Sequence, residues 1–139
     1  MGGILFRAGP AKEIREAHTY LQEHTRVPLL LAANLESGGN GLVLEGTAYG
    51  CNMQVAATDD PIRSAEHLGE IACKEAAAVG GNFSFAPDVD IDMNAHNPLP
   101  TCVPLAADPL TGGSLREGLY PRRTKCRMRY CSKAFPRRR

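Results

Sequence analysis

The stretch that decides the fold is residues 82–98, NFSFAPDVDIDMNAHNP. It begins with an apolar run that is typical of a buried strand, and it ends in a cluster of Asp and Asn side chains. Asp88, Asp90 and Asp92 alternate with apolar residues, so an extended backbone places their carboxylates on one face. Such carboxylates repel one another unless a cation, arginines or the hydroxyl groups of a sugar lie opposite. By itself the cluster is also compatible with a solvated loop of Asp caps and turns.

The segments before this stretch alternate between the patterns of buried strands and amphipathic helices. Continuous apolar runs at residues 2–6, 27–33 and 82–86 predict strands that are covered on both faces. Apolar side chains at three- and four-residue spacing predict a helix over residues 11–25 and a second one that begins at Asp60-Pro61 and ends at Gly80-Gly81. This alternation predicts an α/β fold whose parallel strands are joined by right-handed crossovers.

Polar side chains follow two of the three apolar runs. Asn34 and Glu36 come after the second run, and residues 88–97 come after the third. The loops at the carboxyl ends of parallel strands carry the chemistry of such folds, so both clusters are candidate sites. Glu36 is either a catalytic carboxylate or a polar cap of the Gly-rich turn at residues 38–41. That turn lacks the spacing of a phosphate-binding loop.

Side chains that could bind a metal have plain explanations. His18, His24 and His67 fall within helical patterns and are predicted to be surface residues, whereas His96 lies in the acidic loop, where it could touch a ligand. The five cysteines form neither an even framework nor a CxxC pair, so we expect no disulfide and no structural zinc. Cys73 is predicted to be a small residue on the packed face of a helix. A calcium loop that starts in the Asp cluster fails at its turn and at its last ligand. We therefore expect no metal.

The net charge of +1 conceals two opposite parts of the chain. Residues 1–100 hold 6 Lys and Arg against 13 Asp and Glu, whereas residues 101–139 hold 10 against 2, which gives −7 followed by +8. The basic tail resembles a nucleic-acid-binding arm, so a small interaction protein with an acidic α/β body is the alternative interpretation. Neither a secretory signal nor a membrane span is indicated, and we expect a cytoplasmic protein without a membrane partner.

Four segments in sequence order resemble the N-terminal barrel domain of family 3 glycoside hydrolases, especially the bacterial β-N-acetylhexosaminidase-like branch. They are GGILFRAGP from residue 2, VPLLLAANLESGG from residue 27, EGTAYGCNMQVAATDD from residue 45 and KEAAAVGGNFSFAPDVDIDMNAHNP from residue 74. The resemblance implies that residues 1–100 form part of a (β/α)8 TIM barrel, about strands two to four. Asn34 departs from the family pattern because it stands where a sugar-binding Asp is common.

The resemblance also implies a chemistry. Family members cleave terminal β-linked N-acetylglucosamine or glucose with retention, using an Asp nucleophile and a separate acid/base group. Both groups belong to later segments of the family domain, so we expect this chain to hold no catalytic residue and to be inactive alone. A carbohydrate is the expected partner, and neither nucleic acid nor a cofactor is expected. The implied substrate-binding residues are Asn34, Glu36, Asp88, Asp90 and Asn97.

The resemblance ends near residue 100. Back-translated residues 103–109 read one base earlier can yield the family-like string RTFGSRP, and residues 117–139 read one base later can yield KAYIQGVQNAGCAIAVKHFPGDG. We therefore predict that residues 101–139 are a basic, out-of-frame and disordered tail without regular structure. Resequencing of the source DNA tests this prediction. Three adjacent strands would leave two open edges and an uncovered inner face, so we expect an aggregation-prone monomer.

Overall fold

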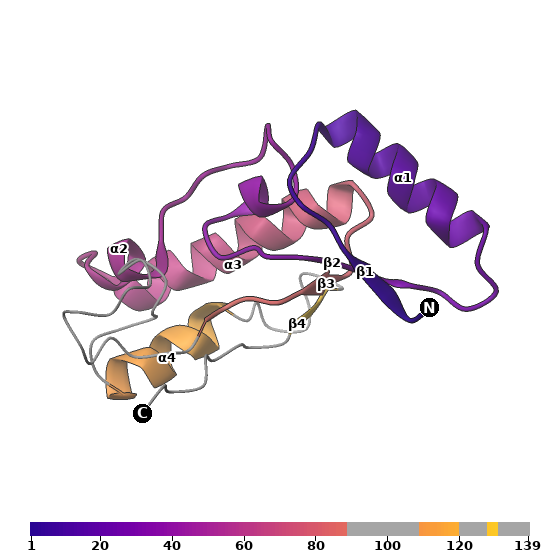
Figure 1. Ribbon diagram of the computed structural model, residues 1–139. Helices are drawn as coiled ribbons and strands as arrows, with labels where there is room; N and C mark the ends of the chain where they lie inside the picture. Colours follow the sequence, from indigo (N-terminus) through magenta and orange to yellow (C-terminus); the bar gives the residue numbers. More distant parts are fainter. Residues whose placement is uncertain (89–108, 120–127, 131–139) are drawn as a thin grey trace, which may run out of the picture.

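The computed structural model describes residues 1–88, 109–119 and 128–130, and in these residues four strands form one parallel sheet in the order of the sequence (Figure 1). The strands are β1 (Gly3–Leu5), β2 (Leu30–Ala33), β3 (Phe83–Ser84) and β4 (Arg129–Tyr130). The helices are α1 (Ala11–Glu23), the 3₁₀ turn η1 (Gly39–Gly41), α2 (Asn52–Ala56), α3 (Pro61–Ala78) and α4 (Pro109–Leu119). The predicted α/β class is confirmed, and the three predicted strands occur within shorter limits.

The two long helices form where the spacing predicts them. α1 begins directly after Pro10, where a missing N–H costs nothing. α3 begins after Asp60, whose Oδ1 accepts a hydrogen bond from the backbone N–H of Arg63 at 3.1 Å. Pro61 lies in the first turn of α3, which fits the fixed backbone angle of proline. The short helix α2 has no counterpart in the sequence-based prediction.

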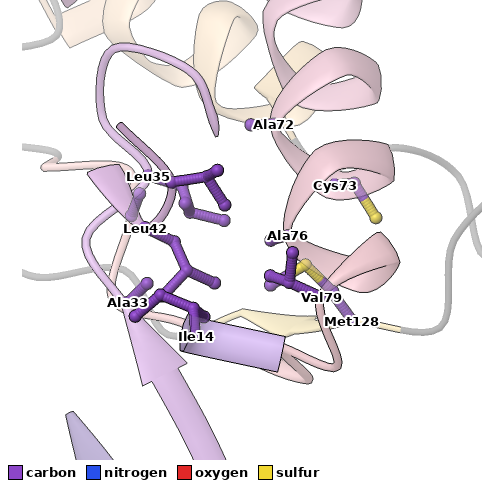
Figure 2. Packing of buried hydrophobic residues seen from close by; sticks show 11 residues of the cluster. Ile14, Ala33, Leu35, Leu42, Ala72, Cys73, Ala76, Val79 and Met128 are labelled. Atoms are coloured by element: carbon purple, nitrogen blue, oxygen red, sulfur yellow. The ribbon is translucent and has the colours of Figure 1, made fainter. Parts of the chain in front are cut away.

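The main core lies between α3 and one face of the sheet (Figure 2). Small side chains of α3 lie in this cluster together with Ala33 of β2 and Leu35 of the following loop. Ile14 of α1 joins the same cluster. The α3 residues in this cluster are Ala72, Cys73 and Ala76, followed by Val79 after the helix.

The tail is not wholly irregular, contrary to the prediction. α4 packs against α3, and its Leu115 and Leu119 are buried in a second apolar cluster with Val55, Ala65 and Leu68. β4 pairs in parallel with β3, and the preceding Met128 is buried in the main core. The sequence signal for α4 is weak because the pair Gly112-Gly113 interrupts it. The rest of residues 101–139 lies outside the described residues.

One predicted side-chain position is wrong, and so is the expectation that no disulfide forms. His18, expected at the surface, is only 2% exposed. Cys73 is buried as predicted, but it forms a disulfide, which was not expected; its partner lies outside the described residues. An odd number of cysteines argues against a complete framework, but it does not exclude a single pair. His24 and His67 are exposed as predicted. Within the described part of the chain, every helix is too short or too polar to cross a membrane.

The first residues of β2 are fixed by two amide side chains. Gln22 of α1 accepts a hydrogen bond from the N–H of Leu29 and donates one to its carbonyl oxygen, both at 3.0 Å. Asn82, just before β3, donates to the same carbonyl at 3.0 Å and accepts from the N–H of Leu31 at 2.8 Å. These bonds satisfy backbone groups that would otherwise be buried without partners, and they set the position of β2 relative to α1 and β3.

Candidate functional site

The loop after β2 carries Asn34 and Glu36 at the carboxyl end of the sheet. Asn34 is exposed, and Glu36 is partly buried. The chain then turns through η1 and passes close to the end of β2, so that a Cβ atom on Gly41 would collide with the backbone oxygen of Asn34. Only glycine allows this approach. The Gly-rich turn therefore shapes the backbone around Asn34.

A carboxylate from α3 fixes the far side of this loop. Glu75 accepts hydrogen bonds from the backbone N–H of Thr47 at 2.8 Å and from the hydroxyl group of the same residue. A Cβ atom on Gly39 would collide with the Glu75 side chain, so the loop can lie against α3 only because this position is glycine. The loop is therefore held at both ends, and Asn34 lies on a fixed backbone.

Glu36 is partly buried and lines a small cavity together with Asn52, the first residue of α2. The cavity has a volume of about 10 Å³, which is about the space that one water molecule needs. Ala86 and Pro87, which follow β3, and Leu119 of α4 line the same space. Oε1 of Glu36 and Oδ1 of Asn52 are shielded from solvent.

Asp88 is the first member of the acidic cluster and is fully buried, with 0% exposure. It follows the cis peptide bond between Ala86 and Pro87. β2 and β3 are adjacent, with Ala33 in register with Ser84. The segments that carry Glu36 and Asp88 therefore leave the same edge of the sheet side by side.

The structure brings together three of the five predicted binding residues at this edge: Asn34, Glu36 and Asp88. Asp90 and Asn97 lie outside the described residues, as does His96. Sequence reasoning did not identify Asn52, which is 2% exposed and lines the space beside Glu36. The segment EGTAYGCNMQVAATDD contains Asn52 and was the available signal.

The arrangement suits the recognition of hydroxyl groups. The exposed Asn34 amide can donate two hydrogen bonds and accept two, and ionised carboxylates accept them strongly. Asp88 is buried and Glu36 is partly buried, so both side chains can hold neighbouring groups in position. Amide and carboxylate side chains of this kind are suited to a polyhydroxylated ligand.

The Glycosyl hydrolase family 3 N terminal domain matches residues 2–103 of this chain. The match spans well over half of the 139 residues, and the chain therefore belongs to glycoside hydrolase family 3. This confirms the family resemblance seen in the sequence.

Individual relatives agree with this assignment. Over 114 residues the chain is 40% identical to a beta-N-acetylglucosaminidase/beta-glucosidase of Cellulomonas fimi, covering 80% of this chain and 20% of that protein. The solved structure of the beta-glucoside phosphorylase BglX bound to 2FGlc has 39% identity and a TM-score of 0.90, covering 97% of this chain and 24% of that one. NagZ from Neisseria gonorrhoeae in complex with N-trifluoroacetyl-D-glucosamine shares the fold, with a TM-score of 0.83 at 20% identity over 98% of this chain and 43% of that one. The chain thus spans between a fifth and less than half of the length of these relatives.

Proposed function

We propose that this chain supplies part of the sugar-binding wall of a family 3 glycoside hydrolase that cleaves terminal β-linked N-acetylglucosamine or glucose with retention. The observation that carries the proposal is the placement of Asn34, Glu36 and Asp88 at the carboxyl ends of two adjacent parallel strands. This is the edge at which (β/α)8 barrels bind their substrates.

The three residues have different tasks in this proposal. Asn34 is exposed and contacts a sugar hydroxyl group directly. Asp88 is fully buried and Oε1 of Glu36 is shielded from solvent, so in this proposal both residues position the loops around the sugar rather than react with it. Asp90 and Asn97, which the family resemblance also implies as binding residues, lie outside the described residues. The relatives named above are described as acting on N-acetylglucosamine and glucose derivatives, which supports this choice of sugars.

Hydrolysis needs two groups that this wall does not include. A retaining enzyme uses a carboxylate that attacks the anomeric carbon and a second group that protonates the leaving oxygen. In our proposal both come from segments of the barrel beyond this chain. The 139-residue chain therefore binds a sugar weakly and does not turn it over.

Two measurements on the purified chain test the proposal. The first is hydrolysis of nitrophenyl N-acetylglucosaminide and nitrophenyl glucoside, for which we expect a rate no higher than that of buffer. The second is binding of N-acetylglucosamine and glucose, followed by NMR chemical shifts. Asn34→Ala removes a hydrogen bond and should weaken binding about tenfold, or ~1.4 kcal/mol.

The matched control for binding is an exposed residue at the opposite, amino-terminal end of the sheet. Glu23→Gln, next to the Gln22 side chain that bonds Leu29 before β2, changes a charge there and should leave the sugar affinity unchanged. Measurable turnover by the isolated chain would contradict the assignment of the reacting groups to other segments. Equal affinity in the Asn34→Ala variant and the native chain would contradict the binding role of Asn34.

A further inference from the structure

Glu75 is a partly buried carboxylate of α3 whose hydrogen bonds run to the loop after β2. Its Oε2 accepts from the backbone N–H of Thr47 at 2.8 Å, and its Oε1 accepts from the hydroxyl group of the same residue. Hydrogen bonds to an ionised carboxylate are shorter and stronger than those between neutral groups. Both oxygens of Glu75 therefore hold one loop residue, its backbone as well as its side chain.

Thr47 in turn lies against the part of the loop that follows Asn34. Its carbonyl oxygen accepts a hydrogen bond from the N–H of Asn40 at 3.4 Å. Two residues further along the chain, the N–H of Tyr49 donates to the carbonyl oxygen of Ser37 at 2.7 Å. The returning part of the loop is therefore bonded to the part that leaves β2, and Glu75 holds the returning part in place.

The 3₁₀ turn η1 lies between Glu75 and Asn34 and is in close contact with both. A Cβ atom added to Gly39, the first residue of η1, would collide with the Glu75 side chain. A Cβ atom added to Gly41, the last residue of η1, would collide with the carbonyl oxygen of Asn34. A displacement of this short turn relative to α3 would therefore displace the backbone of Asn34 as well.

A second carboxylate holds the same loop on its other side, against α1. Oε2 of Glu45 accepts a hydrogen bond from the N–H of Ala11, the first residue of α1, at 3.0 Å. The backbone of Gly9 pairs with that of Val43 on the same side of the loop. These contacts join the loop to the start of α1, whereas the contacts of Glu75 lead to Asn34. The two carboxylates therefore have different tasks in one loop.

We propose that Glu75 is a positioning residue of the sugar site. By holding Thr47, it fixes the backbone from which Asn34 meets a sugar hydroxyl group, and it does so without touching the sugar itself. A binding group that is already held in place loses less conformational freedom when the ligand binds. This inference rests on the proposed function, because it assigns the direct contact with the sugar to Asn34.

Titration of the full chain with N-acetylglucosamine, followed by NMR chemical shifts, tests the proposal. Glu75→Ala should weaken binding about fivefold, and it should have no further effect in an Asn34→Ala background, because the two residues act as one unit. Glu75→Gln should bind like the native chain. Its amide oxygen can accept from the Thr47 N–H, and its NH2 group can donate to the Thr47 hydroxyl oxygen.

Amide hydrogen exchange adds a measurement that needs no sugar. Glu75→Ala removes the acceptor of the Thr47 N–H and loosens the returning part of the loop, so the amides of Thr47 and Tyr49 should exchange faster than in the native chain. Glu75→Gln should keep the native exchange rates. Circular dichroism shows whether each variant keeps the helical fold.

The matched control is Glu45→Ala, the same truncation at the carboxylate on the α1 side. It should lower the stability and leave the sugar affinity unchanged. Native exchange rates in Glu75→Ala would overturn the inference, and so would an equal loss of affinity in Glu45→Ala. Native affinity in Glu75→Ala, together with weakened binding in Asn34→Ala, would overturn the inference alone. Native affinity in Asn34→Ala would instead contradict the proposed function, and the positioning role would be lost with it.

Discussion

At the scale of single residues, His18 shows how a titratable side chain can belong to a core. It lies four residues after Ile14 and so on the same face of α1, which is turned to the protein interior. Its Nδ1–H donates to the carbonyl oxygen of Val79 at 2.7 Å, and its ring meets the Phe6 ring edge to face at 4.4 Å. Its place in a helical pattern predicts a surface histidine. The side chains three and four residues away predict its burial better, because they share its face of the helix.

Burial of His18 predicts a pH-dependent stability. Loss of hydration lowers the pKa of the ring below its ordinary value of 6.5, and the hydrogen bond to Val79 offsets part of this shift. The unfolded chain therefore binds a proton more readily than the folded one below about pH 6.5. We expect the stability to be complete above this pH and to decrease as the pH falls through it, measured as the midpoint of urea unfolding from pH 8 to pH 5.

His18→Asn identifies the group responsible, because an Asn amide can still donate to Val79 but does not titrate. This variant should have a flatter stability profile between pH 8 and pH 5. The control His67→Asn changes an exposed ring and should keep the native profile. The same slope in native protein and His18→Asn would exclude His18 as the origin.

Other residue-scale expectations depended on more than local pattern. Asn34 and Glu36 could be predicted as neighbours of a strand end because apolar runs mark where strands stop. The partly buried position of Glu36 beside Asn52 could not, because it depends on contacts with segments that lie far along the sequence. The Gly-rich turn was recognised as a loop, but its contact with Glu75 arises only from the packing of α3.

At the scale of elements, α3 has the clearest signals and follows the prediction most closely. Its cap, its first-turn proline and its apolar stripe all agree on one helix. The strands are shorter than their apolar runs, since only part of each run has a neighbour with which to form hydrogen bonds. α2 and α4 escaped prediction because short helices depend on tertiary contacts rather than on propensity.

The cap of α3 gives a prediction at this scale. Asp60→Ala removes the side-chain acceptor of the Arg63 N–H and should lower the free energy of unfolding by about 1 kcal/mol. Chemical denaturation followed by circular dichroism measures this loss. Asp59→Ala, one residue earlier and exposed, is the matched control and should change stability little. Equal losses in the two variants would mean that charge, rather than capping, matters at this position.

At the scale of the whole molecule, the tail is either part of the folded body or sequence that was never selected to fold. These two descriptions predict different stabilities. The family match ends at residue 103, whereas the likeness to the BglX structure covers 97% of the chain. Our reading-frame hypothesis treats residues 101–139 as sequence that was never selected to fold. The structure instead buries Leu115 at 1% exposure against α3 and α2 residues.

Leu115→Ala distinguishes these descriptions. If α4 is part of the folded body, the variant leaves a cavity in the second cluster and should lose about 2–5 kcal/mol of stability. The same truncation at Leu44, which is 64% exposed, should cost little. Equilibrium unfolding in urea measures both. An unchanged stability in Leu115→Ala would support a tail that does not contribute to the fold.

The barrel class was accessible from sequence because strand and helix patterns alternate and four motifs occur in family order. The number of strands could not be predicted from the sequence, because β4 pairs through only two residues and has no apolar run of its own. The position of Asn34, Glu36 and Asp88 at one edge followed from the order of the strands. Their different exposures followed from packing, and no local pattern encodes packing.

The paired amides at Gln22 and Asn82 have a consequence for how the protein ages. Spontaneous deamidation of either side chain would replace an NH2 donor by a carboxylate oxygen that faces the carbonyl oxygen of Leu29. Two oxygen atoms would then repel each other where a hydrogen bond now holds the beginning of β2. Slow chemical damage at these two side chains would therefore loosen the amino-terminal rim of the sheet.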